Sequence, residues 1–164
     1  MMLPGFKVQD LKKNIDERGF FAEIYRQDWG DLVGNDRVVQ ANLLYSHPGV
    51  IRAWHRHNSG QTEYFFVLEG TVKVCAYDDR TDSPTIGQLT EAVASTERVQ
   101  VVRVPGFYWH GIKVVGDRPA LTVYCVNRVY DSENPDKERR AWNDSSIIDP
   151  RTGKPYDWNA APHK

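Results

Sequence analysis

Apolar residues along this chain either alternate with polar ones or form short runs, and turn-forming residues separate these segments. The segments are residues 20–25, 38–44, 64–68, 71–77, 99–104 and 120–126. They are rich in Val, Ile, Phe and Tyr, which fit the pleated, half-buried surface of a sheet. Turn signals between them include Pro48-Gly49, Glu69-Gly70 and Pro105-Gly106. Many short strands at this spacing predict an all-β protein, either a sandwich or a closed barrel.

Helical patterns are scarce. Residues 27–33 predict one or two helical turns, and residues 134–142 predict another short helix, with Pro135 near its start. Residues 149–164 are rich in Pro, Gly and polar side chains, so we expect an irregular tail that packs through Tyr156 and Trp158 and frays at its end. The length of 164 residues suits one domain, spanning 1–164.

Composition narrows the classes of function. The formal net charge of -1 gives no global basic field that would attract nucleic acid or an anionic membrane. No apolar run approaches the roughly 20 residues of a membrane helix, and the first residues lack the pattern of a signal peptide. We therefore expect a cytoplasmic protein in which Cys75 and Cys125 are reduced and buried, with a disulfide between them as the open alternative.

Histidines and a carboxylate form a pattern of their own. His55 and His57 lie two residues apart, so a strand would point both rings to one face. Glu63 follows six residues later, and His110 follows Pro105 by five. This order resembles the two-part cupin signature, whose slots are taken by Gly49, His55, His57, Glu63, Gly70, Pro105 and His110. Three imidazoles and one carboxylate suit Fe, Mn, Zn or Ni and leave positions open for substrate or water.

Longer segments resemble the dTDP-4-dehydrorhamnose 3,5-epimerase family, a branch of the cupin superfamily. They are DERGFFAEIYR at 16–26, QANLLYS at 40–46, GVIRAWH at 49–55, YDDRTDSPTIG at 77–87, VPGFYWHG at 104–111 and VYDSENPDKERRAWND at 129–144. The resemblance extends from about residue 4 to residue 158. It implies a cupin jelly roll with a few short helices, no cofactor, and a homodimer that exchanges the N-terminal strands within residues 1–46.

The resemblance also implies a function. It points to an epimerase or isomerase that removes a proton next to the keto group of a nucleotide-linked 4-keto-6-deoxy sugar. The sugar carrier would be a nucleotide diphosphate, which in this family is dTDP, and the product would serve polysaccharide or secondary-metabolite glycosylation.

Substrate-binding roles follow from the resemblance position by position. Arg18 and Arg52 match arginines that bind the diphosphate, a role that suits the planar guanidinium. Phe20 matches a residue that stacks on the base, and Glu23 one that accepts its hydrogen bond. The remaining polar groups expected to line the substrate site are Gln40, Asn42 and His110.

Catalytic roles follow in the same way. His55 matches the family's base, because a neutral imidazole with a pKa near working pH suits proton abstraction. Tyr130 is the candidate for the acid that returns a proton on the opposite face, although its segment is longer than the family pattern.

Two positions depart from the family. Glu63 stands where the family has a lysine that stabilises the enolate, and an ionised carboxylate would repel that negative charge. A C-terminal segment with an aspartate that pairs with the histidine has no counterpart, which leaves Asp144, Asp157 or Glu63 as substitutes.

Three interpretations stay open. A metal held by His55, His57, Glu63 and His110 would replace the lysine, and then His55 is not the base. Alternatively, Glu63 acts as acid or base beside His55 and supports epimerisation at one carbon or a keto-isomerisation. In the third, the chain binds a nucleotide sugar or a partner without catalysis.

Overall fold

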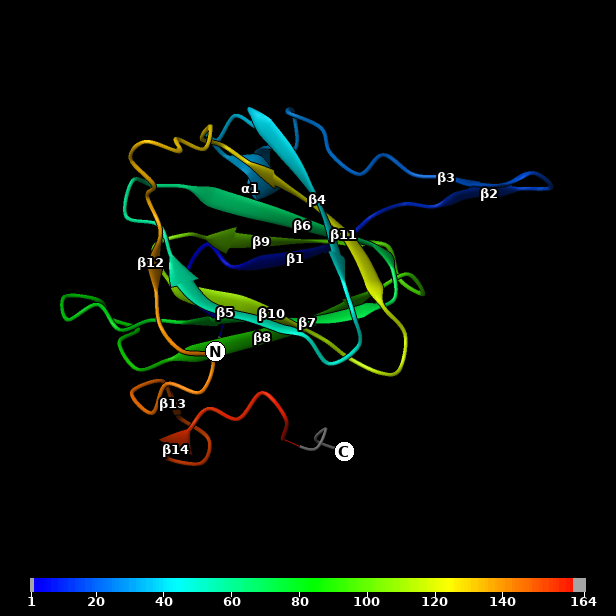
Figure 1. The fold of residues 1–164 in the computed structure, drawn as a ribbon. Helices are drawn as coiled ribbons and strands as arrows, with labels where there is room; N and C mark the ends of the chain where they lie inside the picture. Colours follow the sequence, from blue (N-terminus) through cyan, green and yellow to red (C-terminus); the bar gives the residue numbers. More distant parts are fainter. Residues whose placement is uncertain (1, 161–164) are drawn as a thin grey trace.

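A computed structural model describes residues 2–160 of the chain, and two five-stranded sheets facing each other make up most of it (Figure 1). One sheet has the order β1 (Lys7–Asp10), β9 (Gln100–Pro105), β6 (Thr62–Glu69), β11 (Ala120–Val126) and β4 (Gln40–Ser46). The other has the order β12 (Glu138–Arg139), β5 (Ile51–Arg56), β10 (Trp109–Val114), β7 (Thr71–Tyr77) and β8 (Leu89–Ser95). Neighbouring strands are antiparallel throughout. The predicted all-β sandwich is confirmed.

Small elements surround the two sheets. A hairpin of β2 (Asn14–Asp16) and β3 (Gly19–Phe21) projects away from them (Figure 1). One turn of helix, α1 (Gly30–Val33), lies within the predicted helical segment 27–33. A last hairpin joins β13 (Ile148–Asp149) to β14 (Lys154–Pro155).

The core forms where the inner faces of the two sheets meet. Val72 and Val74 of β7 are buried in one cluster with Phe65 and Val67 of β6 and with Val102 of β9. Such interdigitated inner faces exclude water and supply most of the apolar stabilisation of a sandwich. The sheets are therefore fixed relative to each other, and so are the polar side chains that they direct inward.

The C-terminal segment packs as the sequence predicts. Tyr156 and Trp158 are buried, and the Trp158 ring centroid lies 4.8 Å from that of Trp54 on β5. The segment is less irregular than expected, because the short hairpin at 148–155 precedes these aromatic residues. The predicted fraying of the final residues falls on 161–164, which lie outside the described part of the chain.

Two predicted elements are wrong. Residues 20–25 were expected to form a strand, but β3 ends at Phe21, and Phe20 and Phe21 are exposed on the hairpin. The sequence predicts a helix over residues 134–142, but none forms there, and residues 138–140 pair with β5 instead. The backbone groups of Trp54 and Arg140 donate to each other in both directions, at 3.2 and 3.0 Å. Pairing with the free edge of β5 outweighs the weak local preference for a helix.

The cysteines behave as predicted. Cys75 on β7 and Cys125 on β11 are both free and buried, and burial raises the pKa of each thiol. Within residues 2–160 no helix is long and apolar enough to cross a membrane.

Replacement of Gly111 should test how closely β10 approaches β5. A Cβ atom at this position would lie 2.3 Å from Ala53 Cβ and 2.8 Å from Ala53 Cα and from Arg52 O. Because backbone atoms cannot move away cheaply, we expect Gly111→Ala to lower the free energy of unfolding by about 1–3 kcal/mol. Urea denaturation measures this, with Gly30→Ala, whose Cβ would meet open space at a residue without a positive φ, as the comparison. Equal stability of Gly111→Ala and wild type would contradict the close approach.

Asp36 should make stability depend on pH. Burial alone would raise its pKa, but hydrogen bonds from Tyr64, Arg103 and Asn127 lower it below the ordinary 3.8. The folded protein therefore gains stability above the unfolded pKa and loses it as pH falls through the lowered folded pKa. We expect Asp36→Asn to cost about 1–3 kcal/mol at pH 7. In denaturation curves across the acid range, this difference from wild type should shrink as pH falls; a constant difference would contradict the linkage.

Candidate active site

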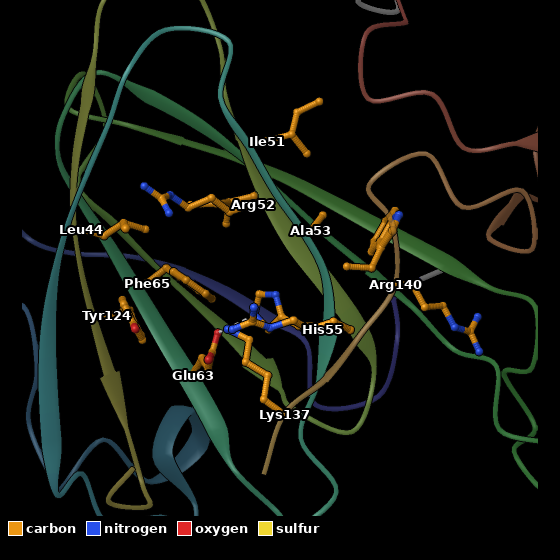
Figure 2. A pocket seen from close by; sticks show the side chains of 13 residues that line it. Leu44, Ile51, Arg52, Ala53, His55, Glu63, Phe65, Tyr124, Lys137 and Arg140 are labelled. Atoms are coloured by element: carbon orange, nitrogen blue, oxygen red, sulfur yellow. Dashed lines mark ion pairs between the residues drawn. The ribbon is translucent and has the colours of Figure 1, made fainter. Parts of the chain in front are cut away.

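A cavity of about 400 Å³ opens between the two sheets. Leu44, Phe65 and Tyr124, from β4, β6 and β11, form its apolar wall, and the Phe65 and Tyr124 rings stack with centroids 5.8 Å apart. The His55 and Glu63 side chains lie next to each other in the cavity, at the far end from Ile51 (Figure 2). The cavity thus presents an apolar surface beside a polar cluster, as small-molecule sites do.

Four side chains make up this cluster, which we call the histidine–glutamate cluster: His55, His57, Glu63 and His110. His55 on β5 and His110 on β10 are directly paired across the ladder, and His57 follows β5. Glu63 comes from β6 in the facing sheet. One potential ligand atom from each residue lies within 4.8 Å of the others, so the sandwich itself brings the cluster together.

Glu63 is at the centre of the cluster. Its Oε1 lies 3.4 Å from Nε2 of His57, and its Oε2 lies 3.2 Å from Nε2 of His110 and 3.9 Å from Nε2 of His55. All four side chains are buried or nearly so, and His55, the most accessible, is 15% exposed. The face that the substrate can reach is therefore that of His55 and Glu63.

Backbone carbonyls hold two of the rings from behind. Nδ1 of His57 contacts the carbonyl oxygen of Asp136, and Nδ1 of His110 lies 2.8 Å from that of Tyr108. A carbonyl oxygen only accepts, so each Nδ1 carries the proton and donates. Each Nε2 is then directed at Glu63. Within the described residues, Nε2 of His57 is buried without a hydrogen-bond partner.

Burial sets the charges of the cluster. Burial and the neighbouring His110 lower the pKa of His55 to about 3, against the opposing effect of Glu63, so its ring is neutral at neutral pH. Burial would raise the pKa of Glu63, but the neighbouring imidazoles, His110 foremost, hold it well below its ordinary value. The carboxylate is therefore ionised while His55 beside it is not.

Cationic side chains line the cavity from two segments. Arg52 comes from β5, and Lys137, Arg139 and Arg140 come from the extended segment 136–140 that runs along it. Figure 2 shows Lys137 extending toward Glu63 and His55. Burial lowers the pKa of Lys137, and Glu63 opposes this shift.

No pattern in the sequence indicates a functional role for Lys137. It lies in a stretch that was expected to be a helix, where a lysine indicates only a solvated surface.

The structure divides the predicted site residues into two groups. Arg52, His55 and Glu63 line the cavity, and His110 lies directly behind them. Arg18 and Phe20 are 86% and 59% exposed on the projecting hairpin, and Glu23 pairs with Arg26 nearby. Within this chain, the second group does not reach the cavity.

The remaining predicted residues lie along β4 and after β11. Gln40 and Asn42 are hydrogen-bonded to each other at 2.8 Å, and the backbone N–H of Tyr130 donates to Gln40. The Tyr130 side chain is 60% exposed, and among the described residues it is not part of the cavity lining. Its acid role stays a prediction.

Two of the three proposed substitutes for the family's aspartate point elsewhere. Asp144 accepts hydrogen bonds from Ser146, and Asp157 accepts one from the backbone of Asn159. Of the three carboxylates, Glu63 is the one that faces His55.

Comparison with known proteins settles the family. The family model for dTDP-4-dehydrorhamnose 3,5-epimerase matches residues 1–149. The chain belongs to the dTDP-4-dehydrorhamnose 3,5-epimerase family. It is thus an epimerase of the type that acts on nucleotide-linked sugars, and the predicted enzyme class and cupin-like fold are confirmed.

Individual relatives agree with this assignment. The chain is 42% identical to the probable low-salt glycan biosynthesis epimerase of Haloferax volcanii, over 96% of this chain and 95% of the relative. It is 34% identical to the spore coat polysaccharide biosynthesis protein SpsL of Bacillus subtilis, over 96% and 97%. The structure superposes with a TM-score of 0.77 and 30% identity on the 3,5-epimerase of Legionella pneumophila bound to dTDP-4-keto-L-rhamnose, over 87% of this chain and 76% of that one.

Proposed function

We propose that this chain epimerises a 4-keto-6-deoxy sugar carried on a nucleotide diphosphate, with dTDP as the carrier in view of the Legionella relative's ligand. The observation that carries the proposal is the single cavity in which Arg52, Lys137 and the neutral His55 surround a space with an apolar wall. A keto group acidifies the C–H bonds beside it. A proton acceptor that lines the cavity can therefore remove such a proton from a bound sugar.

The cationic side of the cavity suits the diphosphate. Nε of Arg52 donates to Ser46 Oγ at 3.0 Å, which orients the guanidinium along the wall of the cavity. Arg139 lines the same cavity from the 136–140 segment. Two guanidinium groups at one mouth can bind phosphate oxygens bidentately, and the apolar wall of Leu44, Phe65 and Tyr124 is left for the deoxy sugar.

Groups in the cavity that can exchange a proton with the sugar include the His55 imidazole, the Lys137 amine and the Glu63 carboxylate. His55 is the base that the family resemblance implies, and Lys137 reaches the same space from another segment. For Tyr130 to act as the acid, the loop after β11 must turn its exposed ring toward the cavity.

A homodimer would complete the nucleotide end of the site. Arg18 and Phe20 are carried by a hairpin that projects from its own sheets and exposes both side chains (Figure 1). A hairpin of this shape has no core of its own, so it suits docking on a second copy. Residues 1–46 would then form the subunit interface, and Arg18, Phe20 and Glu23 would contact the nucleotide in the partner's cavity. The cytoplasm is the location we propose for this dimer.

Deuterium exchange should reveal the chemistry directly. Incubation of the protein with dTDP-4-keto-6-deoxyglucose in heavy water should place deuterium at C3, at C5 or at both, because the abstracted proton exchanges with solvent. Proton NMR of these positions measures the outcome, and the signals that exchange distinguish single from double epimerisation. Tight nucleotide binding with no exchange above the enzyme-free rate would instead support a non-catalytic sugar-binding protein.

Arg52 should be required for binding more than for folding. We expect Arg52→Gln to weaken dTDP binding about tenfold, which corresponds to roughly 1.4 kcal/mol, because one charge-assisted phosphate contact is lost. Calorimetric titration with dTDP measures this. Arg118→Gln, on the exposed turn between β10 and β11, is the matched control and should bind as wild type does. Unchanged affinity of Arg52→Gln would remove Arg52 from the diphosphate site.

A further inference from the structure

We propose that the histidine–glutamate cluster is the binding site of one divalent transition-metal ion. The inference rests on the proposed function, since the ion would lie at the bottom of the sugar cavity. Its ligands would be Nε2 of His55, His57 and His110 and the carboxylate of Glu63, four groups that already lie within 4.8 Å of one another.

The hydrogen bonds behind the rings carry the inference. The carbonyl oxygens of Asp136 and Tyr108 require that Nδ1 of His57 and His110 each hold a proton. With Nδ1 occupied in this way, Nε2 is the nitrogen of each ring that is left to bind an ion, and it lies 3.4 Å (His57) or 3.2 Å (His110) from a carboxylate oxygen of Glu63. Imidazole nitrogens and a carboxylate that converge in a closed, buried space are a donor set typical of transition-metal sites.

The two rings that hold Glu63 are 8% and 0% exposed, so the space between them is closed to solvent. A divalent cation at the centre of the cluster would make each inward-facing Nε2 a ligand. Histidine ligands of metals usually donate their other N–H to a carbonyl or carboxylate, and both rear rings do so here.

The unsatisfied nitrogen is a second, independent observation. Nε2 of His57 is fully buried and, within residues 2–160, has no hydrogen-bond partner, although it is directed at Glu63. Nothing in the described packing uses this atom. A metal bond is the interaction that its direction and burial allow.

The ligand set indicates the class of ion. Three imidazole nitrogens and one carboxylate suit Zn²⁺, Fe²⁺, Mn²⁺ or Ni²⁺, whereas Ca²⁺ and Mg²⁺ prefer oxygen ligands. Within the cluster, His57 and His110 lie on the side away from the cavity, while His55 and Glu63 line the cavity. The open side of the ion therefore faces the space assigned to the sugar, where a cation polarises a keto oxygen.

A metal ion at this site would answer two questions that the sequence leaves open, namely the role of Glu63 and the identity of the base. Glu63 cannot replace a lysine by itself, but as a ligand its negative charge is useful. His55 bound through Nε2 cannot accept a proton from the sugar, and this leaves Lys137 as the group in the cavity that can. Glu63 is for the same reason excluded as an acid or base.

Metal binding tests the site without reference to catalysis. Untagged protein is stripped with a chelator and titrated calorimetrically with Zn²⁺, Mn²⁺, Fe²⁺ and Ni²⁺, and elemental analysis gives the stoichiometry. We expect one ion per chain and a higher melting temperature for the loaded protein. Absence of binding by all four ions, with no change in melting temperature, would overturn the inference.

Variants assign the ligands. His57→Gln and Glu63→Gln should each lose at least tenfold in metal affinity, whereas His47→Gln, an exposed histidine outside the cluster, should bind as wild type does. X-ray absorption of the Zn²⁺-loaded wild type should show imidazole nitrogens together with oxygen, and this holds even if a variant fails to fold. Full affinity in a folded His57→Gln or Glu63→Gln variant, or an absorption spectrum without imidazole, would overturn the assignment.

Deuterium exchange separates this inference from the proposed function. Stoichiometric metal at the cluster without exchange of any nucleotide-linked keto sugar would leave the metal site standing and remove the epimerase reaction. Equal exchange by stripped protein that binds none of the four ions would keep the reaction and remove the metal site.

Discussion

The placement of one carboxylate among three imidazoles is the constraint on which the site depends. Glu63 reaches the cluster from β6, while the histidines come from β5, β10 and the residues just after β5, in the opposite sheet. Strands within one sheet are held by their hydrogen bonds, but the distance between sheets is set by the packed core. The geometry of the cluster is therefore a property of the whole sandwich, and core residues such as Val74 and Phe65 contribute to it indirectly.

The segment 136–140 joins the cavity to this cluster. Its backbone pairs with β5, and Asp136 receives hydrogen bonds from Ser59 and Asn58 while its carbonyl holds His57. Lys137 and Arg139, in the same segment, line the cavity. One short extended stretch thus orients a side chain of the cluster and also supplies three of the four cations that, among the described residues, line the substrate space.

The sequence predicts much of this architecture, for physical reasons that are easy to name. Residues 71–77 and 120–126 are strands with the predicted bounds, because β-branched residues and turn signals mark buried strands clearly. The shared face of His55 and His57 follows from their spacing, and their convergence with Glu63 and His110 is what the resemblance to the cupin signature implies. The structure confirms the convergence.

Other features depend on contacts that no local pattern records. The extended path of residues 138–140 arises from the free edge of β5, so Lys137 could not be assigned to the cavity from sequence. Phe20 is a residue type common in buried strands, but it is exposed on a hairpin. The alternation of apolar and polar residues does not show whether another part of the chain packs against an apolar face. The roles of Arg18, Phe20 and Glu23 likewise depend on a second chain, and their residue types alone cannot supply its position.

The two-residue length of β12 has a consequence for self-association. Open edges of β-sheets recruit strands from other molecules, and proteins commonly blunt them with short or charged segments. Glu138 and Arg139 cover the edge of β5 with charged side chains and offer little further edge to pair. The strand that carries His55 is thereby protected from strand addition. The mouth of the cavity beside it stays accessible to small molecules.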